Sequence, residues 1–259
     1  TVGGSIQNST ADVDVAAGPS SENVGGLVGY LGRIASLSGS SAEGKVNVEE
    51  STNVGGLVGV ANSEIVRSNS SGDVTNTPIA NEISDSTMIG GLVGEANADV
   101  VRSAASGDVQ TSNSQKVGGL IGAAKANVTR SMAYGNVSAT ASTDVGGLIG
   151  NANSVTTHSF ATGKVTGYLN IGGLVGTNSG TVAKSNSTGF VNARGIVAQN
   201  RPRTNSIGGL IGSNSGTITS SYASVDVLTY EPAEDEDESI EDGPAATEVG
   251  GLVGVNTGT

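Results

Sequence analysis

Residues 172–182 read Gly-Gly-Leu-Val-Gly-Thr-Asn-Ser-Gly-Thr-Val, and close copies of this stretch recur along the whole chain. The core of the motif, Gly-Gly-Leu-(Val/Ile)-Gly, places a leucine at positions 27, 57, 92, 120, 148, 174, 210 and 252. Self-similarity with a period of roughly 20–50 residues is typical of solenoids and other repeat folds. A unit of 26–28 residues, lengthened in places by insertions, accounts for every spacing between these leucines.

A second block, Ser-x-small-x-Gly-x-Val, recurs downstream of the motif. It spans residues 68–74, 103–109, 131–137, 159–165 and 185–191, and looser copies occupy 9–15, 40–46 and 221–227. Its period of two predicts a strand with one buried face, formed by the serine, the small residue, the glycine and the valine. The other face is expected to be exposed, and it carries variable residues such as Asn69, Met132, Phe160 and Tyr222.

A third apolar position lies between the two blocks, at Ile65, Val100, Val128, Val182 and Ile218. Each unit therefore predicts a coil of three short strands. One coil cannot bury its own apolar stripe, so coils are expected to stack about 4.8 Å apart with equivalent strands parallel. Because asparagine tolerates a left-handed backbone, the asparagines after the first strand are expected to supply a turn. These asparagines are Asn62, Asn97, Asn153, Asn178, Asn214 and Asn256.

The patterns predict an all-β chain, a parallel β-helix (β-solenoid) of about eight coils that forms a single domain over residues 1–259. Right-handed winding is expected, because left-handed triangular solenoids usually have shorter coils. Loop insertions are predicted at about 75–88, 192–206 and 228–248. Each falls between the last valine of one coil and the next Gly-Gly-Leu, so all three are expected at one corner, which is often the partner-facing side of a repeat protein.

The composition argues against several classes of protein. The 259 residues include 41 glycines, 3% aromatic residues and no cysteine, yet 36% are apolar, which fits a thin, stacked core. The lack of cysteine excludes a disulfide framework and a thiolate metal site. The formal charge of −12 disfavours nucleic acid and anionic membranes. No stretch is long and apolar enough to span a bilayer, so we expect neither a nucleic-acid partner nor membrane insertion.

The longest insertion concentrates acidic residues, at 234–238 and again at Glu241 and Asp242. Carboxylates are suitable ligands for Ca²⁺, but their spacing here does not match the EF-hand loop. Two interpretations remain open at this point, a solvated acidic loop and a calcium site.

Gly-Gly-Leu-(Val/Ile)-Gly, followed by Asn-Ser-Gly-Thr-(Val/Ile) and Ser-x-x-x-Gly-x-Val, resembles the GLUG motif. Residues 173–182 are the clearest copy, and 209–218 are nearly as good. The resemblance implies a β-solenoid stalk or adhesive region, because GLUG repeats occur in secreted or surface-anchored adhesin-like proteins and in the non-catalytic region of bacterial IgA-specific metalloendopeptidases. It supplies no catalytic, cofactor-binding or metal-binding residue, and the His-Glu-x-x-His zinc motif of those peptidases is missing.

The chain is not expected to be an enzyme or to hold a cofactor. His158 is the only histidine, so it cannot build a His-based metal site. The recurring serines have no base beside each of them, and they are expected to hydrogen-bond to one another along the rod. Five Asn-x-(Ser/Thr) triplets are potential glycosylation sites in a secreted protein, although a chain this rich in Asn, Ser and Thr also makes them by chance. They begin at Asn8, Asn69, Asn127, Asn136 and Asn186.

The leading functional hypothesis is a structural or adhesive solenoid of a secreted or cell-surface protein, whose loops contact a protein or glycan on a host or neighbouring cell. The first alternative is a filament or surface layer. Residues 4–6 match 216–218 and neither end has an obvious cap, so either the array continues or subunits stack end to end. The second alternative is a carbohydrate- or ice-binding solenoid, and the irregular exposed residues of the second block disfavour ice.

Overall fold

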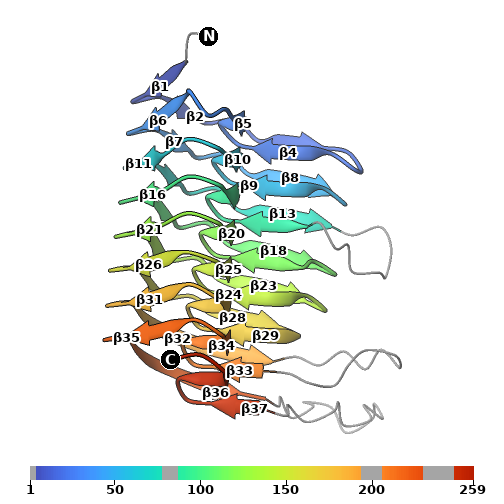
Figure 1. Ribbon diagram of the computed structural model, residues 1–259. Coiled ribbons are helices and arrows are strands. Elements are labelled where there is room, and N and C mark those ends of the chain that lie inside the picture. The colour runs from blue at the N-terminus through green and yellow to red at the C-terminus, as the bar shows by residue number, and fades with distance from the viewer. Residues whose placement is uncertain (1–3, 78–86, 194–205, 230–247) are drawn as a thin grey trace, which may run out of the picture.

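The computed structural model describes residues 4–77, 87–193, 206–229 and 248–259, and this part of the chain contains strands and no helix. Short strands follow one another around a coil, and successive coils stack along one axis (Figure 1). Strands of neighbouring coils pair in parallel, as Val93 and Ile121 do. The predicted all-β parallel solenoid is confirmed.

Four sheets run along the rod, labelled A to D here. Sheet A contains β1 (Ser5–Gln7), β6 (Ser36–Ser38), β11 (Ile65–Val66), β16 (Val100–Val101), β21 (Val128–Thr129), β26 (Val155–Thr157), β31 (Thr181–Ala183) and β35 (Thr217–Thr219). Sheet C contains β4 (Glu22–Gly25), β9 (Thr52–Gly55), β14 (Met88–Gly90), β19 (Lys116–Gly118), β24 (Thr143–Gly146), β29 (Leu169–Gly172), β33 (Ser206–Gly208) and β37 (Glu248–Gly250). Sheet D contains β5 (Val28–Leu31), β10 (Val58–Ala61), β15 (Val93–Ala96), β20 (Ile121–Ala124), β25 (Ile149–Ala152), β30 (Val175–Asn178), β34 (Ile211–Asn214) and β38 (Val253–Asn256).

Sheet B has two rows of strands. The first row contains β2 (Thr10–Ala11), β7 (Ser41–Ala42), β12 (Asn69–Ser70), β17 (Ala104–Ala105), β22 (Met132–Ala133) and β27 (Phe160–Ala161). The second row contains β3 (Val15–Ala17), β8 (Val46–Glu49), β13 (Val74–Thr77), β18 (Val109–Ser112), β23 (Val137–Thr140) and β28 (Lys164–Gly167). The two rows merge in the long strands β32 (Asn186–Ala193) and β36 (Tyr222–Leu228).

The register of the coils is the one that the leucine spacing predicts. Val93 pairs with Ile121, and Ile121 pairs with Ile149, so these coils contain 28 residues each. Sheets A, C and D each hold eight strands in the described part of the chain, which confirms about eight coils. Right-handed winding stays a prediction.

The prediction of three strands per coil is wrong in number. The first predicted strand divides into a strand of sheet C and a strand of sheet D, and the third divides into the two rows of sheet B. In most coils both breaks fall at a glycine whose Cβ would meet the backbone of a neighbouring coil. A Cβ on Gly56 would lie 2.2 Å from the carbonyl oxygen of Gly91, and a Cβ on Gly72 would lie 1.9 Å from that of Gly44.

The interior consists of two apolar clusters rather than a single tube. One cluster joins sheets A and D to the first row of sheet B, and Leu120, Val128 and Ala133 represent it in one coil. The other joins sheet C to the second row of sheet B, as Val117 and Val137 do. Leucine, alanine and valine therefore form columns, so that each coil buries its apolar residues against the coils above and below it.

Glycine also explains why sheets C and D lie so close together. A Cβ on Gly122 in sheet D would lie 2.6 Å from the amide nitrogen of Ile89 in sheet C and 2.7 Å from the carbonyl oxygen of Gly94. The last glycine of the motif thus lets two backbones pack with no side chain between them. This contact is the physical reason for the third glycine in Gly-Gly-Leu-(Val/Ile)-Gly.

The three predicted insertions begin and end slightly differently from their predicted bounds. Strand β13 continues to Thr77, which pairs with Glu49, and strand β14 begins at Met88. Likewise, β32 continues to Ala193 and β36 to Leu228. The predicted bounds overlapped these strands because ladder pairing extends past the last valine of the block. Residues 78–86, 194–205 and 230–247 lie outside the described residues.

Candidate functional site

Buried serines form a continuous ladder at the corner between sheets A and B. The backbone N–H of Ser103 donates to Oγ of Ser131 in the next coil at 3.2 Å, and Oγ of Ser131 donates to the carbonyl of Thr129 at 3.1 Å. The same pattern links Ser40, Ser68, Ser103, Ser131, Ser159, Ser185 and Ser221. The hydroxyls therefore connect coils, as expected from the sequence, and their hydrogen-bonding capacity is used within the fold.

The residue before each serine has a left-handed backbone, and in five successive coils this residue is basic. Arg67, Arg102, Arg130, His158 and Lys184 have φ values between 49° and 52° and are exposed. We call these five residues the basic ladder. A left-handed backbone costs a residue with a Cβ about 1–2 kcal/mol, and glycine and asparagine adopt it most readily. The basic ladder was missed at the sequence level, although its residues directly precede the serine of each second block.

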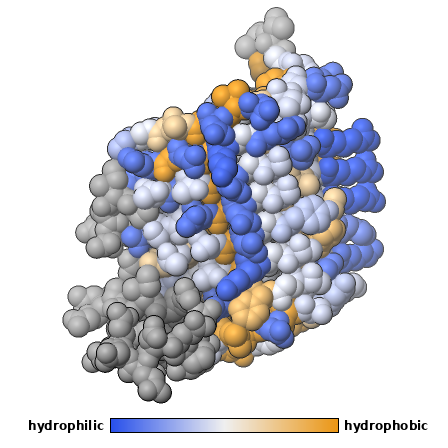
Figure 2. Space-filling model, turned by 180° about the vertical axis from the view of Figure 1, so that it is seen from behind, coloured by the Kyte–Doolittle hydropathy of each residue, from blue (hydrophilic) through white to orange (hydrophobic). Residues whose placement is uncertain are grey.

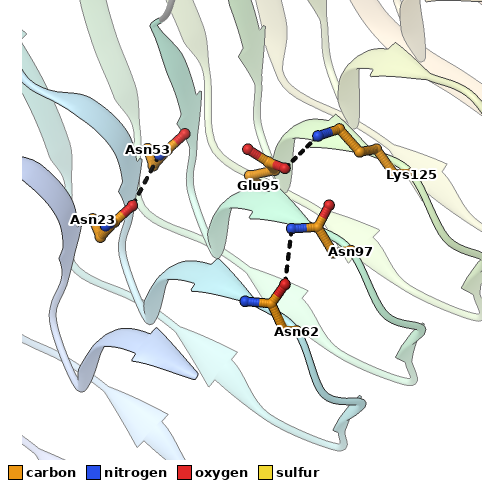
Figure 3. A network of polar contacts seen from close by, with 6 residues as sticks. All are labelled: Asn23, Asn53, Asn62, Glu95, Asn97 and Lys125. Atoms are coloured by element: carbon orange, nitrogen blue, oxygen red, sulfur yellow. Dashed lines mark hydrogen bonds and ion pairs between the residues drawn. The ribbon is translucent and has the colours of Figure 1, made fainter. Parts of the chain in front are cut away.

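The expectation that the recurring asparagines supply left-handed turns is wrong, because none of the six has a positive φ. Left-handed asparagines occur elsewhere: Asn23, Asn53 and Asn170 directly precede the first Val or Ile of the motif, and Asn8 and Asn113 also have a positive φ. Nδ2 of Asn53 donates to Oδ1 of Asn23 at 2.9 Å across neighbouring coils (Figure 3). Figure 3 also shows Asn97 donating to Asn62, and the ion pair between Lys125 and Glu95.

The predicted asparagine row in fact divides into two rows. Asn62, Asn97 and Asn153 lie in the turn that follows sheet D. Asn178, Asn214 and Asn256 lie one residue earlier, at the last position of their strands, where Ala152 precedes them in the column. The side chains of Asn178 and Asn214 are completely buried.

Acidic and amide side chains on the outer face of sheet B also have a structural role. Oδ1 of Asp73 accepts the backbone N–H of Asp108 at 3.1 Å, and Oδ1 of Asp108 accepts the N–H of Asn136 at 2.8 Å. Asn136 in turn accepts the N–H of Lys164 at 2.9 Å. Each of these side chains accepts a backbone N–H of the next coil. Their recurrence along the rod is therefore explained by the fold, without a bound ligand.

His158 and Ser159 do not form a catalytic pair. Ser159 is buried in the serine ladder, whereas His158 is exposed, with Nδ1 3.0 Å from Oγ1 of Thr157. The asparagines of the glycosylation triplets are exposed or half-buried, and Asn69, Asn136 and Asn186 lie on the outer face of sheet B as predicted. Asn127 accepts the hydroxyl of Ser154 at 2.8 Å.

Within the described ranges, no three His, Asp or Glu side chains gather in a way that suits a metal ion. The acidic residues at 234–238, Glu241 and Asp242, which carried the calcium hypothesis, lie outside those ranges. No helix in the described part of the chain is long and apolar enough to cross a membrane.

The fold and the hydrogen-bonded ladders define a parallel β-solenoid in which each coil repeats one sequence motif. Residues 20–47 match the family model of the GLUG motif, which confirms the resemblance seen in the sequence. The match runs once around the rod, from the residues before β4 into β8, and it falls on an early coil rather than on residues 173–182. No curated protein and no solved structure matches the chain.

Proposed function

We propose that the chain is the structural and adhesive solenoid of a secreted or cell-surface protein, with no catalytic step and no cofactor of its own. The observation that carries the proposal is the contrast between the inside and the outside of the rod. Inward positions repeat from coil to coil, as Val109, Val137 and Val165 do, and these valines are buried. Outward positions of sheet B vary, as Asn69, Ala104 and Met132 do at one position of successive coils.

The interior is suited to a stiff spacer. Serine and asparagine side chains hydrogen-bond from coil to coil, and the apolar columns continue through the described coils. A solenoid of this kind holds its surface residues at fixed distances along an extended face, which is how repeat proteins present binding surfaces. The insertions support the same function, because all three connect sheet B to sheet C at one corner.

Two measurements on the producing cells test this proposal. An antibody against the solenoid is expected to label intact cells, and attachment of the cells to their target surface is expected to fall when the coding sequence of the solenoid is deleted. Labelling that requires permeabilised cells, or unchanged attachment, would contradict it. A catalytically essential role would instead appear as loss of an enzymatic reaction without loss of attachment.

A filament of subunits stacked end to end is the second candidate function. Val249 and Leu252 are 50% and 41% exposed, whereas their equivalents Ile207 and Leu210 in the preceding coil are fully buried. A further coil, from the same or another chain, would cover these residues. Sedimentation at increasing protein concentration tests whether a coil of another chain covers them. Concentration-dependent growth that Leu252→Lys abolishes supports a filament, and a strictly monomeric rod argues against one.

A further inference from the structure

We propose that the basic ladder binds an acidic polysaccharide that carries about one carboxylate per sugar, with the polymer lying along the rod axis. The inference rests on the proposed adhesive function and deepens it by naming the class of ligand. The five residues occupy one line, because the residues directly before them pair from coil to coil: Val66 with Val101, Val101 with Thr129, Thr129 with Thr157 and Thr157 with Ala183.

Arginine, lysine and histidine are unfavourable at this corner, because its backbone has a left-handed φ. Asn8 and Gly39 occupy the same position in the first two coils, and these are residue types that accept a left-handed φ easily. The next five coils use arginine, lysine and histidine at φ values of 49° to 52° instead. The left-handed φ does not itself require a basic residue, since Ser220 has a φ of 48° at the same position in the next coil. We therefore attribute the five basic side chains to a requirement for charge and not to the turn.

The cations of the basic ladder are not neutralised by the fold. Among the described residues, the ion pairs join Lys45 to Asp73 and Lys125 to Glu95, and none involves the basic ladder. The positions directly before the ladder are Val66, Val101, Thr129, Thr157 and Ala183, and none of them is charged. The arginine and lysine side chains of one line repel one another, and a linear anion laid along them relieves this repulsion.

The arrangement of the basic ladder favours a polymer with a single line of charges. The ladder offers one basic side chain per coil, and a chain of uronic acid residues offers one carboxylate per sugar. Nucleic acid is wider and more densely charged. Figure 2 shows hydrophilic side chains standing out in a row along one edge of the rod.

An apolar platform lies beside the middle of the basic ladder. The rings of Tyr134 and Phe160 meet edge to face, with centroids 5.7 Å apart, and Tyr134 is 46% exposed. Met132 pairs with Phe160 in the neighbouring coil, and the hydroxyl of Tyr134 donates to the sulfur of Met132 at 3.1 Å. These residues follow Arg130 and His158 by two to four positions, so a sugar whose carboxylate contacts the ladder can pack its C–H face on the rings.

The test measures binding of the purified chain to polygalacturonate by calorimetry at low and at high salt, with EDTA present so that calcium does not gel the polymer. Neutral dextran and single-stranded oligodeoxythymidylate are the comparison probes. Binding to polygalacturonate that weakens with salt, and much weaker binding to both comparison probes, is the expected result. Equal or tighter ladder-dependent binding to the oligonucleotide would assign the site to nucleic acid and overturn the proposal, as would no binding to polygalacturonate.

The decisive variant replaces Arg67, Arg102 and Arg130 by Asn. Because asparagine accepts a left-handed φ, this variant is expected to melt at the same or a higher temperature while its affinity for polygalacturonate falls about tenfold or more. The control replaces Lys45, Lys116 and Lys125 by Gln, which changes the net charge by the same amount elsewhere on the rod. An equal loss of affinity in the control would reduce the effect to net charge and refute the basic ladder as the site.

The same variant separates this inference from the proposed function. Cells that still attach when their protein carries the three Arg→Asn substitutions, but not when they lack the solenoid, would keep the adhesive function and reject the ladder as its binding site. Attachment of cells that lack the solenoid would contradict the proposed adhesive function. Binding of the purified chain to polygalacturonate would still decide whether the basic ladder is a polysaccharide site.

Discussion

Nδ2 of Asn178 donates a hydrogen bond to Oδ1 of Asn214 at 2.7 Å, and both side chains are completely buried in successive coils. Nδ2 of Asn214 in turn donates to Oδ1 of Asn256, also at 2.7 Å. The ladder stops at Asn178, whose Oδ1 has no donor among the described residues, because the preceding position in the column is Ala152. One column of the core thus changes from apolar to polar along the rod.

Asn214→Ala is expected to destabilise the fold more than Asn178→Ala does. Asn214 has partners on both sides, so its removal breaks two hydrogen bonds of the column, each worth about 0.5–1.5 kcal/mol. Asn178 already has one unsatisfied oxygen, so its loss removes fewer bonds. Chemical denaturation of the two variants measures the difference. Equal destabilisation would show that these bonds do not act as a chain.

Gly122→Ala is expected to destabilise the contact between sheets C and D. The new Cβ would lie within 2.7 Å of backbone atoms of Ile89 and Gly94, so the two backbones must separate, which costs about 1–3 kcal/mol or more. Gly18→Ala is the matched control, because a Cβ there meets no atom within 4 Å. Thermal melting followed by circular dichroism compares them. A melting temperature for Gly122→Ala equal to that of the control would rule out this explanation of the motif.

Ser131→Ala is expected to cost about 1–3 kcal/mol, because the backbone N–H of Ser103 loses its buried acceptor. Ser71→Ala changes an exposed serine within the block at residues 68–74 and is expected to stay within about 0.5 kcal/mol of the parent. Amide hydrogen exchange provides a local readout, since protection at Ser103 should fall before protection in distant coils. Unchanged protection there would contradict a structural role for the serine ladder.

Removal of residues 93–120 is expected to leave a folded, shorter solenoid. This segment is one complete coil, and its loss joins Leu92 to Ile121, the residue that pairs with Val93. In repeat proteins stability is approximately a sum over coils and their interfaces, so the shortened rod should keep a cooperative transition. Removal of residues 93–106, half a coil, breaks the register and serves as the control. Similar circular dichroism spectra and melting curves for the two deletions would argue against the coil as the structural unit.

The spacing of the motif leucines was enough to predict the stacking and register, because parallel pairing of equivalent residues follows from the repeat itself. The number of strands was not predictable from period alone. The break after Gly55 falls inside an apolar run, and only the approach of the Gly91 carbonyl makes a turn there necessary.

At the candidate site, the sequence placed the serines on the inner face correctly but misplaced the asparagines. A shift of one residue moves a side chain from the turn into the core. The two rows differ in their distance from the motif leucine, which is five residues for Asn153 and four for Asn178, and grouping them as one row overlooked this difference. The basic ladder could be recognised only from the backbone conformation. An arginine before a serine carries no signal in the sequence, whereas the structure shows that Arg67, Arg102 and Arg130 share a left-handed φ at one corner.

The pairing of Val93 with Ile121, and of Ile121 with Ile149, also has a consequence for the gene. Equivalent codons in these coils are separated by the same number of residues, so a crossover between misaligned copies removes or duplicates whole coils and preserves the reading frame. Unequal recombination can therefore change the length of the rod in steps of one coil. Each added step would also bring its own corner residue, and with it a chance to lengthen the row of positive charge.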